Sequence, residues 1–115
     1  MTELAGLAQR VRAFAAARDW ERFHTPKNLA MALSVEAAEL LEVFQWVTED
    51  QSRNLEPRAH AAASEEIADV LLYLLRISDV LGIDPVTAAQ DKMKANEGKY
   101  PVDRARGNSK KYTEL

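Results

Sequence analysis

Residues 65–75 read EEIADVLLYLL, and this stretch decides the fold. From Ile67 to Leu75 it is apolar nearly all round, and no part of the chain shows the strict alternation of a β-strand. Pro57 can open a helix in its first turn, and Gly82 is a residue that favours helix termination. We therefore expect a helix over residues 57–81, and an all-α fold built around it.

Helical spacing of apolar residues extends outward from this segment in both directions. The dipeptides Thr25-Pro26 and Asp84-Pro85 each combine an N-cap with a first-turn proline, which marks two further helix starts. The sequence thus predicts three more helices, over residues 3–18, 26–47 and 85–97. Together the four indicate a four-helix bundle-like domain.

The remaining segments are polar. We expect a loop over residues 48–56 and an extended basic tail over 98–115. Between Lys92 and Lys111 seven basic residues outnumber two acidic ones, although the whole chain carries a net charge of −3. This basic end is either a solvated surface or a partner for an anion held elsewhere in the fold.

The composition limits the classes of protein that this sequence can represent. Its 115 residues suit one domain, residues 1–115, and a hydrophobic fraction of 47% is typical of a globular chain. No cysteine is present, which excludes disulfides, zinc thiolate sites and a cysteine nucleophile. There is no apolar run long enough for a membrane helix and no secretion signal, so we expect a cytoplasmic protein.

Two acidic pairs interrupt the apolar stripes of neighbouring helices. Glu36 and Glu39 are three residues apart in one, and Glu66 and Asp69 are three apart in the next. Residues at this spacing share a helix face, so antiparallel packing could gather four carboxylates. Either pair alone would be an ordinary surface feature, but four buried carboxylates need a cation or protonation.

The ligand types restrict the metal. Carboxylate oxygens suit Mg²⁺, with Mn²⁺ as a possible substitute. A di-iron bundle would need Glu-x-x-His on its helices, and neither His24 nor His60 has that spacing. Because Mg²⁺ in proteins usually meets substrate phosphates, an acid-only site favours phosphoryl chemistry.

At these residues the sequence resembles the all-α nucleoside triphosphate pyrophosphatases of the MazG-like superfamily, and within it the dCTP pyrophosphatase group. The superfamily is marked by Glu-x-x-Glu on one helix and Glu-x-x-Asp on the next. The resemblance extends from Arg18 to the end of the chain. Its supporting segments, in order, are residues 18–24, 36–40, 44–46, 65–71, 92–96, 99–102 and 106–113.

The resemblance implies roles for individual residues. The metal ligands would be Glu36, Glu39, Glu66 and Asp69. The substrate-binding residues would be His24, Trp46 and Tyr73 at the base and sugar, with Lys92 and Asn96 at the phosphates. It also implies a dimer or tetramer whose pocket is completed by a second chain.

These expectations combine into one reaction. An Mg²⁺-dependent hydrolase would convert a (d)NTP and water into the monophosphate and pyrophosphate, with dCTP or a related pyrimidine nucleotide as substrate, to clear unwanted nucleotides. Glu39 would activate the water and Lys92 would stabilise charge on the transferring group. No membrane or nucleic-acid partner is expected. Two alternatives stay open: a non-catalytic helical interaction module, and a nucleic-acid binder acting through the tail, which the acidic body disfavours.

Overall fold

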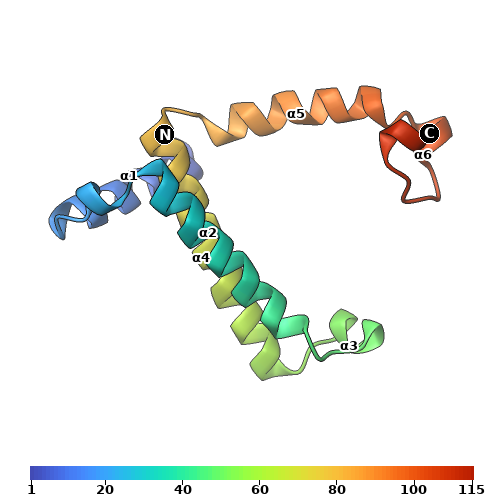
Figure 1. Cartoon of the computed structure of the whole chain (residues 1–115), viewed down its shortest axis with the longest axis horizontal. Helices are drawn as coiled ribbons and strands as arrows, with labels where there is room; N and C mark the ends of the chain where they lie inside the picture. The colour runs from blue at the N-terminus through green and yellow to red at the C-terminus, as the bar shows by residue number, and fades with distance from the viewer. The chain divides into compact units, whose positions relative to one another are not determined.

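A computed structural model describes all 115 residues, and every regular element in it is helical. The elements in chain order are α1 (Glu3–Ala17), the 3-10 helix η1 (Glu21–Phe23), α2 (Pro26–Phe44), α3 (Glu49–Arg53), α4 (Pro57–Leu81), α5 (Pro85–Lys99), α6 (Val102–Ala105) and the 3-10 helix η2 (Tyr112–Glu114) (Figure 1). The prediction of an all-α fold is confirmed. The chain divides into two compact units, Met1–Ile83 and Asp84–Leu115.

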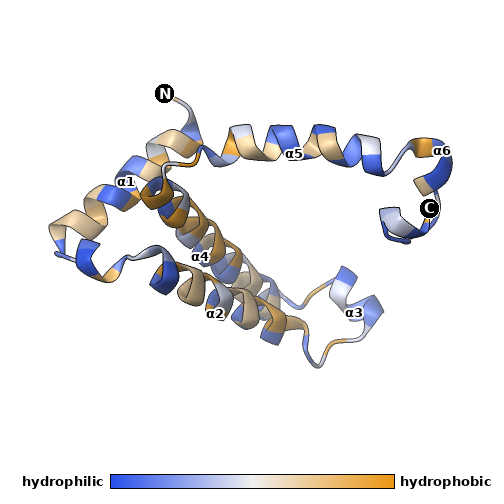
Figure 2. Cartoon of the chain, turned by 45° about the horizontal axis from the view of Figure 1, so that its top comes forward, coloured by the Kyte–Doolittle hydropathy of each residue, from blue (hydrophilic) through white to orange (hydrophobic).

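The first unit is built around α4. Helices α2 and α4 lie side by side and run antiparallel, and α1 packs against α4 (Figures 1 and 2). The buried apolar side chains are Ala15 of α1, Leu29 of α2, and Ala63 and Leu75 of α4. Small residues at two of these positions allow the helix backbones to approach closely. The antiparallel α2–α4 pair is the frame that brings the two acidic motifs opposite each other.

Local sequence signals set the helix ends. Thr25 caps α2 by accepting a hydrogen bond from the Asn28 backbone N–H, and Pro26 occupies the first turn. Gly82 ends α4 with a positive φ of 68°, a backbone conformation that glycine adopts at little cost. The starts of α2, α4 and α5 and the end of α4 agree with the sequence prediction.

Two differences from the prediction occur between α2 and α4. Helix α2 ends at Phe44 rather than Val47, and the expected loop contains the short helix α3. A capping box starts α3: Thr48 and Gln51 each bond the other's backbone N–H. As the N-cap of α3, Thr48 has extended backbone angles, so no helix runs through it.

The second unit also departs from the prediction at its end. Helix α5 continues through Gly98 to Lys99, and the expected extended tail contains α6 and η2. The Tyr100 and Tyr112 rings meet edge to face, with centroids 6.1 Å apart, and the Lys99 ammonium lies over the Tyr112 ring. These aromatic contacts fold the tail back on itself, which charge composition alone does not predict.

Many large apolar side chains of the first unit stay exposed. On α4, Ile67, Leu71 and Leu74 follow i, i+4, i+7 spacing and form one exposed apolar face, and Met31 and Val35 of α2 add to the exposed apolar surface. Hydrophobic colouring runs along both helices in Figure 2. No helix combines the length and apolar character that crossing a membrane would require.

Candidate functional site

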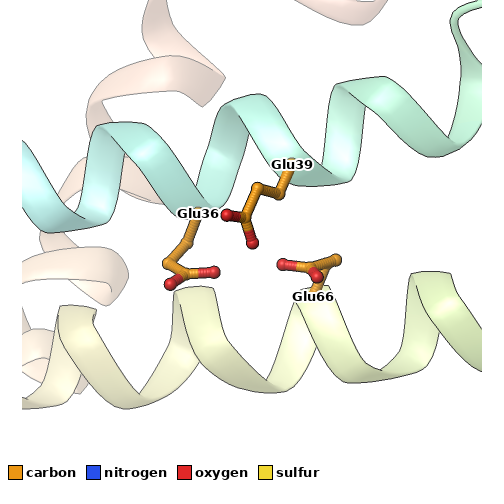
Figure 3. A group of neighbouring side chains, drawn as sticks. All are labelled: Glu36, Glu39 and Glu66. Carbon is orange, nitrogen blue, oxygen red and sulfur yellow. The ribbon is translucent and has the colours of Figure 1, made fainter.

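The structure gathers three of the four predicted acidic ligands. Glu36 and Glu39 project from α2 toward Glu66 of α4, and one carboxylate oxygen from each lies within 4.8 Å of the others (Figure 3). We call these three residues the acidic cluster. The antiparallel packing of α2 and α4 thus brings carboxylates of the two helices together, as their i,i+3 spacing predicted. Asp69, one turn along α4, is not among the three that meet this distance, and it lines a cavity.

Burial and mutual repulsion disfavour the charged forms of two cluster members. Burial, and then the neighbouring carboxylates Glu36 and Glu39, raise the pKa of Glu66 to about 7. Burial is the main cause that raises the pKa of Glu36, and a hydrogen bond with Glu39 and the negative charge of Glu39 also raise it. All three side chains are half-buried, so water does not fully screen their charges from one another.

The acidic cluster fits a hard divalent cation. Glu36 Oε2 and Glu66 Oε2 are buried and have no hydrogen-bond partner. A buried carboxylate oxygen without a partner is unfavourable unless a proton or a cation neutralises it. Every donor in the cluster is a carboxylate oxygen, the ligand type that Mg²⁺ and Mn²⁺ prefer. Glu36, Glu39 and Glu66 can therefore bind a divalent metal ion.

A cavity of about 390 Å³ opens between α1, α4 and the two residues that flank η1, Trp20 and His24. Its apolar lining consists of Leu7, Val11, Phe14, Ala15, Trp20 and Leu72. Its polar lining consists of Arg10, His24, Asp69, Tyr73 and Arg76. A mostly apolar cavity with a few converging polar groups is the usual form of a small-molecule site. Asp69 follows Glu66 by three residues on α4, and its charge is among the causes that raise the pKa of Glu36, so the cavity adjoins the acidic cluster at Asp69.

Four charged or polar side chains form a network, and two of them, His24 and Arg76, line the cavity. Arg76 Nε donates to His24 Nδ1 at 3.0 Å, and Arg76 Nη1 donates to Asp79 Oδ2 at 3.3 Å. Arg12 of α1 completes the network with two hydrogen bonds to the Asp79 carboxylate, one of them at 2.8 Å. We call Arg12, His24, Arg76 and Asp79 the His24 network. It joins α1 and the segment before α2 to the C-terminal half of α4.

The other predicted site residues lie away from these groups or in the second unit. Trp46 follows the end of α2, is 88% exposed and does not line the cavity. Lys92 and Asn96 lie one turn apart on α5, with Lys92 exposed and Asn96 half-buried. The structure therefore brings His24, Asp69 and Tyr73 to one cavity, while the roles of Trp46, Lys92 and Asn96 stay predictions.

The sequence interpretation missed Arg76, and a signal for it was present. Arg76 stands seven residues after Asp69 and three after Tyr73, so all three share one face of α4. It is a charged residue inside an apolar helical segment, which is the argument that singled out Asp69. Arg12 and Asp79 lie 67 residues apart, and no local pattern pairs them.

Comparison with known sequences identifies the class of protein that this arrangement represents. A sequence model of the MazG-like family matches residues 31–115, which contain both acidic motifs. The chain therefore belongs to the MazG-like family.

Named relatives agree with this family. The chain is 46% identical over 104 residues to dCTP pyrophosphatase 1 of Homo sapiens and 45% identical to the same enzyme of Mus musculus. Each match covers 89% of this chain and 61% of the relative, so the chain spans about three-fifths of their length. A solved structure, a pyrophosphatase from Archaeoglobus fulgidus, superposes with a TM-score of 0.82 at 45% identity, covering 88% of this chain and 94% of the other.

Proposed function

We propose that the chain is a metal-dependent nucleoside triphosphate diphosphohydrolase that acts on dCTP or a related pyrimidine nucleotide. In the reaction, water attacks the α-phosphorus, the bond between this phosphorus and the α–β bridging oxygen breaks, and pyrophosphate leaves. The products are a nucleoside monophosphate, pyrophosphate and a proton. The names of the relatives support the substrate class. The proposed location is the cytoplasm.

The observation that carries this proposal is the acidic cluster beside a cavity. Two unpartnered buried oxygens, on Glu36 and Glu66, call for a cation, and the cavity next to them can hold a small organic group. A nucleotide has both parts: a polyanion that a cation can bridge to carboxylates, and an aromatic base that suits apolar walls. We propose Mg²⁺ as the ion, with Mn²⁺ as a substitute.

Each acid has a proposed task. Glu36, Glu39, Glu66 and Asp69 would hold the ion, which when bound neutralises charge on the phosphate oxygens. Glu39 would also orient the attacking water and accept its proton. Glu39 suits this role because it belongs to the cluster but, unlike Glu36 and Glu66, has no buried oxygen that lacks a partner.

The substrate contacts follow from the cavity and the resemblance. His24 and Tyr73, which line the cavity, would contact the base and sugar, and Trp46 would stack on the base. Lys92 and Asn96 share a face of α5 and would bind the phosphates, with Lys92 stabilising charge on the transferring group. The proposal assigns no nucleic-acid or membrane partner.

We further propose that the active form is a homo-oligomer. Ile67, Leu71 and Leu74 form an exposed apolar face on α4, and such faces are typical of protein interfaces. Leu74→Glu would place a charge in that interface and should shift the protein toward monomer in sedimentation equilibrium. The matched control is Arg58→Glu, an exposed position near the start of α4. An unchanged mass for Leu74→Glu would contradict an interface through this face.

The test of the activity is a pyrophosphate-release screen across canonical and base-modified dNTPs, with Mg²⁺ present and then removed by EDTA. We expect turnover only with the cation, and highest kcat/KM for a cytosine or related pyrimidine nucleotide. Thermal melting in the same solutions reports binding independently, because a ligand of the folded state raises Tm. Neither turnover nor a shift in Tm with any nucleotide would favour an interaction module.

A further inference from the structure

Arg76 is a buried cation that the proposed reaction does not use. Its residue exposure is 6%, although arginine is almost never buried without a partner. Two of its nitrogens are committed, Nη1 to Asp79 and Nε to His24. The Asp79 carboxylate compensates the charge, and Arg12 holds Asp79 from the α1 side. This arrangement fixes the Arg76 guanidinium against the cavity wall.

The hydrogen bond to His24 has a chemical consequence for the imidazole. A guanidinium has only donors and stays protonated in proteins, so His24 Nδ1 must be the acceptor. A neutral imidazole that accepts at Nδ1 carries its proton at Nε2. Burial, and then the positive charge of Arg76, lower the pKa of His24, which favours the neutral ring. No hydrogen bond within the chain engages Nε2.

The position of the ring is also restrained. His24 ends η1, and its backbone N–H donates to the carbonyl oxygens of Trp20 and Glu21. The Trp20 and His24 rings meet edge to face, with centroids 6.2 Å apart. The backbone, a neighbouring ring and Arg76 thus hold an imidazole that lines the cavity and has one free donor.

We propose that Arg76 is a positioning residue that sets the tautomer of His24, so that His24 presents its Nε2–H to an acceptor atom of the nucleobase. The acceptor would be a ring carbonyl oxygen or an unprotonated ring nitrogen, both of which cytosine offers. This inference rests on the proposed function for the identity of the ligand. The tautomer itself depends only on the protein.

The first test is nuclear magnetic resonance of the free protein, which needs no substrate. Long-range ¹H–¹⁵N correlation spectra above the pKa of His24 should show Nε2 protonated and Nδ1 unprotonated. His60, exposed on α4, serves as the internal reference, and His60→Gln assigns the two sets of signals. Arg76→Met should move His24 toward a mixture of tautomers. A proton on Nδ1 in the wild type, or an unchanged tautomer in Arg76→Met, would overturn the proposal.

The second test separates positioning from a merely structural role. Losing one well-aligned hydrogen bond to the base should raise KM for dCTP about threefold to tenfold in Arg76→Met, with kcat within about twofold. Arg76→Lys keeps a cation for Asp79 but offers one nitrogen in place of the separate Nε and Nη1 donors, so it should fold and still show the raised KM. Arg58→Met makes the same change at an exposed site of α4 and should alter neither constant. An Arg76→Lys enzyme with wild-type KM would refute the role.

The two tests keep the inference distinct from the function on which it rests. A chain that hydrolyses no nucleotide would fail the proposed function, whereas the spectra would still decide whether Arg76 sets the tautomer. If kcat falls and KM stays unchanged in both Arg76 variants, Arg76 acts on the reaction and not on base recognition, which also overturns the inference.

Discussion

Two clusters of ionisable side chains, each including residues of α4, compensate the burial of charge in opposite ways. The acidic cluster places three carboxyl groups together and leaves two buried oxygens without partners. The His24 network alternates cations with a carboxylate, and hydrogen bonds join all four of its side chains. The first arrangement is incomplete without a ligand, whereas the second is complete within the protein apart from one imidazole nitrogen.

This difference indicates that the acidic cluster binds a ligand and that the His24 network positions a side chain. A buried group without a partner in the chain favours binding of a ligand, because the unpaired state is costly in free energy. A group whose partners are all internal acts through the geometry that it imposes. Changes in the acidic cluster should therefore affect activity far more than stability, and changes in the His24 network should affect stability and substrate affinity.

The largest expected effect is that of Glu39→Gln. The amide keeps the size of the side chain but cannot accept the proton of the attacking water, so kcat should fall about a thousandfold or more. Pyrophosphate release measures the loss, and circular dichroism should show an unchanged helical signal. Glu42→Gln, at an exposed position of the same helix, is the matched control. Wild-type turnover in Glu39→Gln would remove this residue from the mechanism.

The next effect tests the His24 network. Asp79→Ala leaves the buried Arg76 without its carboxylate, and breaking a buried ion pair on one side should cost about 3 kcal/mol in the free energy of unfolding. Urea denaturation measures this change. Asp50→Ala removes an equally spaced Arg–Asp pair that is fully exposed, and it should change stability little. If both substitutions changed the free energy of unfolding equally, the Asp79 carboxylate would not be needed to compensate the charge of Arg76.

The pH dependence of stability should distinguish the two clusters in sign. Hydrogen bonding from Arg12 is the main cause that lowers the pKa of Asp79. The stability that the ionised Asp79 contributes to the fold is fully present above pH 3.8, the pKa of the free side chain. It is lost as the pH falls through the lower pKa of the folded state. Glu66 behaves in the opposite way, because its pKa is raised to about 7. Without metal, the free energy of unfolding should fall as the pH rises from 4.5 to 7, since the folded state retains a proton that the unfolded state releases.

Urea midpoints measured in EDTA across this range check the slope contributed by Glu66. Glu66→Gln should flatten it, and Glu65→Gln, an exposed neighbour, should leave it in place. Saturating Mg²⁺ should also reverse the trend, because the cation binds the deprotonated cluster and stabilises the folded state. An identical slope in Glu66→Gln would mean that another group titrates.

The smallest stability effect is expected for Trp46→Ala. The side chain is 88% exposed, so its removal should change the free energy of unfolding by less than about 0.5 kcal/mol. Trp20→Ala, which removes a cavity wall and an edge-to-face partner of Phe14, should cost clearly more. If Trp46 stacks on the base, KM for dCTP rises in Trp46→Ala although stability does not. An unchanged KM would remove Trp46 from the substrate site.

Local signals explain how much of the fold was predictable. The Thr-Pro and Asp-Pro starts of α2 and α5, and the Gly82 end of α4, depend on a few adjacent residues, so the sequence located them. Helix α3 was missed because the segment that its Thr48–Gln51 capping box opens is polar and has no apolar periodicity. The turn of the tail was missed because the Tyr100–Tyr112 contact joins residues twelve apart.

The candidate site divides along the same line. Helical spacing and interrupted apolar stripes were enough to select the four acidic residues. A carboxylate in the apolar face of a helix is unusual, whichever neighbour that face packs against. The four are Glu36, Glu39, Glu66 and Asp69. That three of them meet while Asp69 faces the cavity depends on the offset between α2 and α4. Helix spacing determines which side chains share a face, but it contains no information on how far two helices slide past each other.

The sequence by itself therefore determined an all-α chain, its main helices and an acidic set suited to a hard cation, since all of these follow from composition and short-range periodicity. Only the tertiary structure decided that Arg12, Asp79, Arg76 and His24 form one network, and that this network leaves the Nε2 donor of His24 at a cavity. The physical reason is that hydrogen bonds between distant segments depend on directions and distances that exist only once the helices are packed.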